Sequence, residues 1–439
     1  MTQLSFASLN SGPTSDSQAV LGMAHTRVGR WSLYGLATFP VVDYALRYHG
    51  DPIGSVWSKL VLLAMVGLAV SRYLGGVRPR WFAWNRFAVA YIVFCLGLLF
   101  AGLASPLISV EGFRMDVYDI LFVFLIPFIV QPSDVEKLLH IGASLAILIA
   151  IDGVFQYVMK VPIPASWTSS AGVVHTRVFS VLVSSNEMGA YMALMTPIIT
   201  GLAYYTKDRW LRWLYSGGTL VCLLALLLTF TRGALFALIL SLLLVALWFD
   251  RRLLIALLAV AVVAFFLPPV QHRIADLFSP VYWLKSAQEG GRIAKWNTAY
   301  DKMSGNPLLG SGLGQYGGAV ASDFHLGVYS DNYYAKILGE SGLLGLMVFL
   351  SMHLALLRDM FKNAAQQVNK RTRYVMLGGA AGILAVLIHN SVENVFEFSP
   401  MALSYFFYAT LFLIWGQGMV EGEPPHAHAN LSSPTESIQ

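Results

Sequence analysis

The sequence predicts an all-α protein that crosses a membrane about 12 times. Hydrophobic residues make up 56% of the 439 residues, and charged residues only 12%, which is about half of the share found in soluble domains. The apolar residues form continuous runs, such as 221–230 and 253–267, whereas the strands of a membrane β-barrel alternate apolar and polar positions. These observations exclude a soluble protein and an outer-membrane barrel.

The apolar runs also set the predicted order of spans, since one α-helical crossing needs about 20 mostly apolar residues. Asp43 and Arg47 weaken the first run and Pro127 interrupts the fourth, so we expect 10 to 12 crossings. The runs centre on 31–46, 56–71, 87–104, 117–131, 139–158, 187–205, 212–230, 234–249, 253–269, 337–357, 374–391 and 401–419.

Lys and Arg residues indicate the orientation, because they accumulate in short cytoplasmic loops. With both ends of the chain in the cytoplasm, most of the clustered basic residues lie on that side, and the one long loop lies outside. The predicted regions are a cytoplasmic N-terminal tail over 1–30, nine spans over 31–269 with an outer loop at 159–186, a large outer loop over 270–333, three spans over 334–419, and a disordered cytoplasmic tail over 420–439.

The sequence offers no motif for a cofactor or a cysteine metal site. Cys95 and Cys222 lie in different apolar runs, and the chain has no CxxC or Cys/His cluster. The glycine-rich stretch 310–318 lacks the Gly-Lys-Ser/Thr of a P-loop and follows no strand, so its glycines predict tight turns and close backbone approach to a ligand. The net charge of +5 comes from residues that flank apolar runs, and we expect neither a cofactor nor nucleic acid as a partner.

Outward-facing arginines are the first candidates for chemistry. Arg177 precedes the sixth span, Arg232 lies at a tight outer junction of two spans, and Arg292 shares a predicted short helix of the long loop with Trp296. A guanidinium at a membrane boundary needs water, a carboxylate or a phosphate. Taken alone, Arg177 is more simply interpreted as an interfacial anchor, and Arg232 could be paired structurally to fix its hairpin.

Polar residues next to two later spans are the second group. Asp331 and Asn332 stand before the tenth span, and His389, Glu393 and Glu397 lie at the outer end of the eleventh. Asp331 could instead cap the helix that follows. The polar residues near 389–397 could form a site or simply satisfy one another.

These residue types suit transfer of a group from a diphosphate. Guanidinium groups bind phosphate oxygens bidentately, and fixed cations can stabilise the charge on a departing diphosphate without a metal. An acceptor hydroxyl needs a general base, for which Asp331, Glu393 and Glu397 are the candidates.

Four stretches together resemble the O-antigen ligase and Wzy-type polymerase superfamily of bacterial inner-membrane glycosyltransferases. They are RVFSVLVSSNEMGAY, TFTRGALFALIL, GGRIAKWNTAYDKMSGNPLLGSGLGQY and DNYYAKILGESGLLGL, and they span about 177 to 346. The resemblance implies a GT-C-like helical fold in the inner membrane, a large periplasmic loop over the active cavity, and an undecaprenyl-diphosphate-linked glycan as donor. It also implies that Arg177 and Arg292 bind the diphosphate, whereas Arg232 matches a recurrent arginine that could have a structural role. The substrate-binding candidates are Arg232, Trp296, Asn332, His389 and Glu393.

One position departs from the ligase pattern. Ligases that load O-antigen onto lipid A core typically have a catalytic histidine where this chain has Asp331, before Asn332. Aspartate is more similar to the polymerases, which favours a Wzy-type polymerase of exopolysaccharide or O-antigen repeat units, working with other components of a polysaccharide assembly pathway. An O-antigen ligase and a related enzyme that glycosylates protein remain alternatives within the superfamily.

A transporter of lipid-linked oligosaccharide is the alternative of another class. It would also use arginines for diphosphate, but it should show repeated halves and charged residues at mid-membrane. Asp43 and Asp152 are the acidic residues expected deep in spans, and neither has a symmetric partner.

Overall fold

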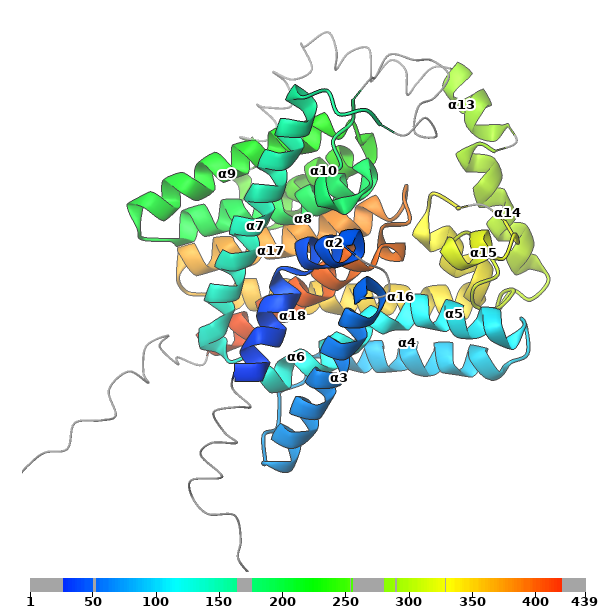
Figure 1. Cartoon of the computed structure of the whole chain (residues 1–439), viewed down its shortest axis with the longest axis horizontal. Coiled ribbons are helices and arrows are strands. Elements are labelled where there is room, and N and C mark those ends of the chain that lie inside the picture. Colours follow the sequence, from blue (N-terminus) through cyan, green and yellow to red (C-terminus); the bar gives the residue numbers. More distant parts are fainter. Residues whose placement is uncertain are drawn as a thin grey trace, which may run out of the picture.

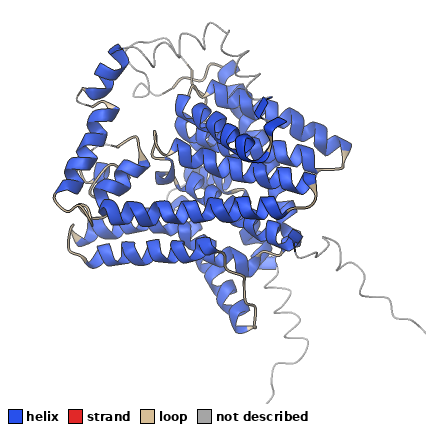
Figure 2. Ribbon diagram, turned by 180° about the vertical axis from the view of Figure 1, so that it is seen from behind, coloured by secondary structure: helices blue, strands red, loops and turns tan. Residues whose placement is uncertain are grey.

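The structure, a computed structural model, describes residues 27–49, 53–163, 176–252, 254–255, 280–288, 290–327 and 329–420. Every regular element within these ranges is a helix (Figure 2). The all-α prediction is confirmed for this part of the chain. Most of the predicted span 253–269, both predicted tails and parts of both outer loops lie outside the described residues.

Eight of the described helices are long and apolar enough to cross a membrane. They confirm a multi-pass membrane protein but not the predicted count of 12. The candidate spans are Val56–Leu74, Ala83–Phe100, Pro132–Val158, Arg209–Leu228, Arg232–Phe249, Tyr333–Gln366, Lys370–His389 and Ser399–Met419.

Figure 1 labels the helices that the following paragraphs use. Residues 27–37 are also helical and precede α2. The α-helices are α2 Phe39–His49, α3 Ile53–Leu74, α4 Ala83–Phe100, α5 Pro106–Val117, α6 Leu121–Ile129, α7 Pro132–Val158, α8 Ser185–Tyr205, α9 Arg209–Leu228, α10 Arg232–Phe249, α13 Pro280–Ala287, α14 Arg292–Ser304, α15 Ala319–Asp323, α16 Tyr333–Gln366, α17 Lys370–His389 and α18 Ser399–Val420, and the 3-10 turns are η1 Tyr118–Ile120, η3 Ser180–Leu182 and η4 Val395–Glu397.

The first and fourth predicted spans are not single long helices. The first is divided by a turn at Thr38, whose hydroxyl donates to the carbonyl of Tyr34 at 2.8 Å. The fourth falls into the end of α5, the turn η1 and the nine-residue helix α6, which contains Pro127. Proline has no N–H for the helical ladder, and α6 ends two residues after Pro127. The division of the run lies earlier, at η1.

The close packing of α8 against α17 positions the start of α8 and the end of α17. The two run antiparallel, and glycines let the backbones meet: a Cβ at Gly378 would lie 2.3 Å from the carbonyl oxygen of Pro197, and one at Gly382 would lie 2.2 Å from that of Leu194. Figure 1 shows α8 and α17 between α9, α10 and α18. The start of α8 therefore lies beside the end of α17, and the candidate site lies at this junction.

The glycine-rich stretch packs against a break in α16. Gly342 has a φ of 65° inside that helix, a conformation that glycine adopts without strain. At the break, the backbone N–H groups of Ser311 and Gly312 donate to the carbonyls of Gly339 and Glu340, each at 2.9 Å. A Cβ at Gly310 would lie 2.6 Å from the carbonyl carbon of Glu340. The sequence predicts that these glycines let the backbone approach a ligand, whereas Gly310 and Gly312 bring it against α16.

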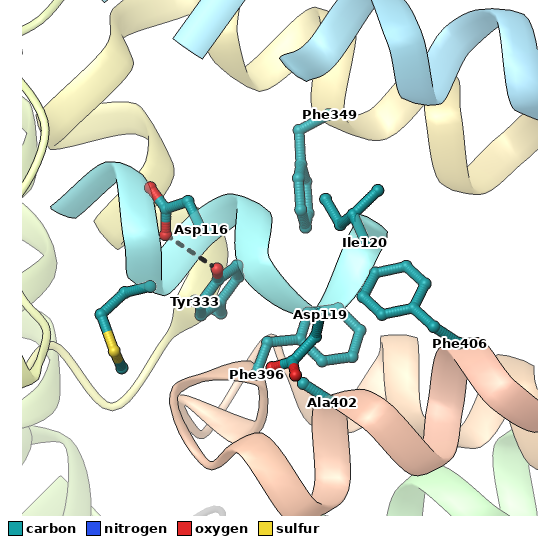
Figure 3. A pocket seen from close by; sticks show the side chains of 9 residues that line it. Asp116, Asp119, Ile120, Tyr333, Phe349, Phe396, Ala402 and Phe406 are labelled. Atoms are coloured by element: carbon teal, nitrogen blue, oxygen red, sulfur yellow. Dashed lines mark hydrogen bonds between the residues drawn. The ribbon is translucent and has the colours of Figure 1, made fainter. Parts of the chain in front are cut away.

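A buried ion cluster ties this region to α5 and η4. Lys336 Nζ lies 2.6 Å from Asp116 Oδ1, 3.1 Å from Glu340 Oε2 and 3.1 Å from Glu397 Oε1. All four side chains are at most 5% exposed. Tyr333 adds a hydrogen bond from its hydroxyl to Asp116 Oδ1 at 3.1 Å (Figure 3). One lysine therefore holds three carboxylates from three separate segments.

Lys336→Met is expected to destabilise the protein by about 3–5 kcal/mol, because removing one partner leaves buried charges uncompensated. Lys362 lies exposed farther along α16, so Lys362→Met is the matched control. Thermal unfolding in detergent measures both variants. Equal melting temperatures would show that the cluster does not stabilise the fold.

Candidate functional site

The candidate site lies where the ends of several helices meet, on the side predicted to face outside. The segment before α8, the junction of α9 and α10, and the segment after α17 form one side. The start of α14 and the turn before α16 form the other. The antiparallel packing of α8 and α17 brings the first and third segments together, and Thr231 at the junction of α9 and α10 donates to the carbonyl of Ser185. Hydrogen bonds join the turn at 330–333 to residues 390–394, and the pair of Lys295 and Asp331 joins α14 to that turn.

Arg177 is fixed by the helix ends around it. Its Nε donates to the carbonyl of Thr229 at 2.9 Å, and its Nη2 donates to Asn186 Oδ1 at 3.2 Å and to Thr231 Oγ1 at 3.3 Å. Burial lowers the pKa of the guanidinium, while the charge of Glu393 opposes this shift. Nη1 donates to none of the described residues, so this nitrogen of the guanidinium group is available to a ligand.

Asn186 connects Arg177 to the carboxylate of Glu393. Its Oδ1 accepts from Arg177, and its Nδ2 donates to Glu393 Oε2. The side chain can span these partners because it leaves the first turn of α8, where Ser184 accepts a hydrogen bond from the backbone of Glu187 as the helix cap. The side-chain amide of Asn186 therefore lies between the guanidinium of Arg177 and the carboxylate of Glu393 and hydrogen-bonds to both.

Asn332, and not Asp331, caps α16. The Asn332 Oδ1 accepts from the backbone N–H of Ala335 at 3.1 Å. Asp331 has a φ of 51°, a left-handed conformation that Asp and Asn adopt more readily than most residues. Asp331 Oδ2 accepts from Lys295 Nζ at 2.8 Å, and the two side chains are 27% and 19% exposed. The carboxylate is therefore held by a lysine and remains accessible at the site.

Asn394 holds the turn that contains Asp331 against the segment after α17. Its Oδ1 accepts from Ser330 Oγ at 3.0 Å and from the backbone N–H of Asn332 at 2.9 Å, and its Nδ2 donates to the carbonyl of Gly317 at 2.5 Å. The turn brings Asp331 near Glu393. Burial, followed by the charge of Asp331, raises the pKa of the Glu393 carboxyl.

Glu393→Gln is expected to raise thermal stability above neutral pH and to change it little near pH 4. A raised carboxyl pKa in the folded state lowers stability as pH rises from the unfolded pKa through the folded pKa. Glutamine removes this loss and can still accept from Asn186. Melting temperatures of both proteins across pH 4–9 measure the effect, and a constant difference between them would contradict it.

The other predicted residues occupy different environments around this centre. Arg292 is exposed at the first turn of α14, and its charge favours the ionised form of Glu393. Arg232 is exposed at the first turn of α10, directly after Thr231. His389 is buried at the end of α17, and its Nδ1 has no hydrogen-bond partner among the described residues.

Trp296 lies on α14 beside the start of α16. It packs against Ala299, Tyr316 and Ala335 and lines an open groove between α14 and α16 with Asn332 and Tyr334. Trp296 therefore helps to hold α14 on α16. Glu397, the third carboxylate considered as a base, accepts from the backbone of Ala319 at 2.9 Å and belongs to the Lys336 cluster.

Lys295 and Asn186 are among the residues that contact the predicted ones and that sequence reasoning missed. Lys295 follows Arg292 by three residues, a spacing that puts both on one face of a helix, so helical periodicity could have identified it. Asn186 lies in the quoted stretch before the sixth span, but nothing in its local pattern indicates that it bridges Arg177 and Glu393. Only the packing of α8 against α17 brings these groups together.

Comparison with known proteins gives one finding. Residues 217–350 match the family model described as O-antigen ligase, and a search of curated proteins found no match. The matched segment contains Arg232, Arg292 and Asp331, and it ends within α16. The match confirms the resemblance to the superfamily of O-antigen ligases and Wzy-type polymerases.

Proposed function

We propose that this protein is an inner-membrane glycosyltransferase that uses an undecaprenyl-diphosphate-linked glycan as donor and polymerises repeat units in the manner of a Wzy-type polymerase. The observation that carries the proposal is the convergence of Arg177, Arg292 and Lys295 with Asp331 and Glu393 at one end of the helices. The family match over residues 217–350 supports the same chemistry.

In the proposed reaction, cations bind the leaving group. The free Nη1 of Arg177 and the exposed guanidinium of Arg292 bind diphosphate oxygens and stabilise the charge that develops as the bond to the sugar breaks. Arg177 is already oriented by three hydrogen bonds, so little side-chain entropy is lost on binding. Asn186 keeps its guanidinium apart from Glu393 and leaves it available to the donor.

A carboxylate acts as the general base for the acceptor hydroxyl. Asp331 takes the proton of the acceptor hydroxyl while that oxygen bonds to the anomeric carbon, and the diphosphate leaves with the bonding electrons. Lys295 orients the carboxylate and faces the same side of α14 as Arg292. Because Asn332 caps the N-terminus of α16, the Asp331 side chain is not needed as the cap.

Asp331 also favours the polymerase over the ligase, since ligases of the superfamily typically have histidine at this position. Transfer to lipid A core remains the second candidate because the matched family is described as O-antigen ligase. The test is in vitro transfer by the purified protein with a defined lipid-diphosphate oligosaccharide and no other lipid. A ladder of longer lipid-linked glycans supports the polymerase. Product that forms only after lipid A core is added assigns the ligase, and no transfer to either acceptor rejects both.

Transfer is expected to continue in the presence of EDTA at an unchanged rate, because the guanidinium groups supply the positive charge that a metal would otherwise provide. Initial rates with EDTA, with EDTA plus excess Mg²⁺, and without additions measure this. A rate that falls in EDTA and returns with Mg²⁺ would show that a metal takes part.

A further inference from the structure

A polar cavity lies far from the candidate site, at the opposite helix ends. It has a volume of about 270 Å³ and is lined by Arg30, Leu33, Arg72, Ile129, Gln131 and Asp134, together with Gly29. These residues come from the helix over 27–37, the last turn of α3, the end of α6 and the start of α7. Figure 1 places these elements together around α3 and α6.

The guanidinium groups of the two arginines in this cavity have no partner among the described residues. Neither the Arg30 nor the Arg72 side chain makes a hydrogen bond or a salt bridge with any of them. Arg78, which is close by, instead donates to the carbonyls of Tyr73 and Val77, and its guanidinium lies 4.0 Å from the centre of the Tyr73 ring. The cavity therefore collects two arginines that are available to an external anion.

The wall of the cavity is partly apolar, and aromatic residues surround it. Leu33 and Ile129 are buried in the protein core. Trp31, Tyr73 and Trp81 are 73%, 50% and 49% exposed at the same helix ends. Exposed tryptophan and tyrosine at helix ends mark the interface between membrane and water. The cavity thus lies at the depth of lipid headgroups, and by the distribution of Lys and Arg it faces the cytoplasmic leaflet.

We propose that this cavity binds the phosphate headgroup of an anionic phospholipid. Two unpaired arginines match the negative charge of a phosphodiester, and Leu33 and Ile129 give the glycerol and first acyl carbons an apolar contact. Asp134 partly opposes binding, and it is held at the start of α7, where its Oδ2 accepts from the backbone N–H of Gln131 at 3.4 Å. This inference does not depend on the proposed glycosyltransferase activity.

The test measures lipid retention by the full-length protein in detergent, using native mass spectrometry with phosphatidylglycerol, phosphatidylcholine or inorganic phosphate. The double variant Arg30→Gln/Arg72→Gln is expected to bind phosphatidylglycerol about tenfold more weakly than the unaltered protein. The control Arg209→Gln/Arg251→Gln removes the same charge from exposed positions on the same predicted side and is expected to bind as the unaltered protein does.

Asp134→Asn provides a test in the opposite direction. It removes the opposing charge, keeps an oxygen that can accept from Gln131, and is expected to strengthen phosphatidylglycerol binding several-fold. Equal binding by the cavity and control double variants would overturn the proposal, and so would no gain for Asp134→Asn. Inorganic phosphate that competes at concentrations similar to the lipid would show that the cavity takes free phosphate and would also overturn it.

Discussion

Arg177→Ala is expected to lower the rate of glycan transfer at least about 10²- to 10³-fold, the range found when one fixed donor to a developing negative charge is removed. The guanidinium is anchored to the carbonyl of Thr229 and to the side chains of Asn186 and Thr231. Alanine removes both the charge and the fork that would bind the diphosphate. Initial rates with purified protein and a lipid-diphosphate oligosaccharide measure the loss.

Arg177→Lys separates charge from geometry. Lysine keeps the positive charge, but it cannot hold three partners and still present a planar fork to phosphate, so we expect most of the loss to remain. Arg114→Ala is the control, because Arg114 is an outer arginine whose side chain is 52% exposed and pairs with Glu111. Normal transfer by Arg177→Ala at a normal protein level would remove this residue from the proposed mechanism.

The fold class could be predicted from the sequence because hydropathy is a local property of the chain. Continuous apolar runs need no knowledge of packing, and most of the predicted runs correspond to long helices. The short segments were harder, because their lengths depend on the surrounding structure. The run at 117–131 is apolar enough to cross a membrane, yet it contains Asp119. This carboxylate is buried and accepts a hydrogen bond from the Ser399 hydroxyl of α18 at 2.9 Å.

The sequence could predict the residues that are expected to carry the chemistry of the candidate site, but not the residues that hold them in place. Arg177 and Asp331 stand out because charge near the edge of an apolar run is costly, and Arg292 stands out because it lies in one of the stretches that carry the family resemblance. Their partners do not stand out: Asn186 and Lys295 lie among other polar residues, and long-range packing alone makes them neighbours. The sequence likewise could not decide which residue caps α16, since Asp331 and Asn332 are both good caps. The backbone settles this choice in favour of Asn332.

Asp331→Asn is expected to lower the rate of transfer about 10²- to 10⁴-fold, the usual contribution of a general base, with little change in donor binding. Asparagine tolerates the left-handed backbone at this position and leaves the Asn332 cap in place, so the variant removes the charge without disturbing the turn. Asp301→Asn, on the exposed face of α14, is the matched control.

The comparison of rate with donor binding distinguishes the two roles that Asp331 could have. A base acts on the acceptor hydroxyl, so its loss lowers kcat at saturating donor. A carboxylate that served only to hold Lys295 would, when neutralised, release that lysine and α14, and the effect would appear mainly as weaker donor binding through Arg292. An unchanged kcat with a raised KM for the donor would therefore assign Asp331 to positioning α14, and the base would then be sought at Glu393, the other carboxylate beside Arg177.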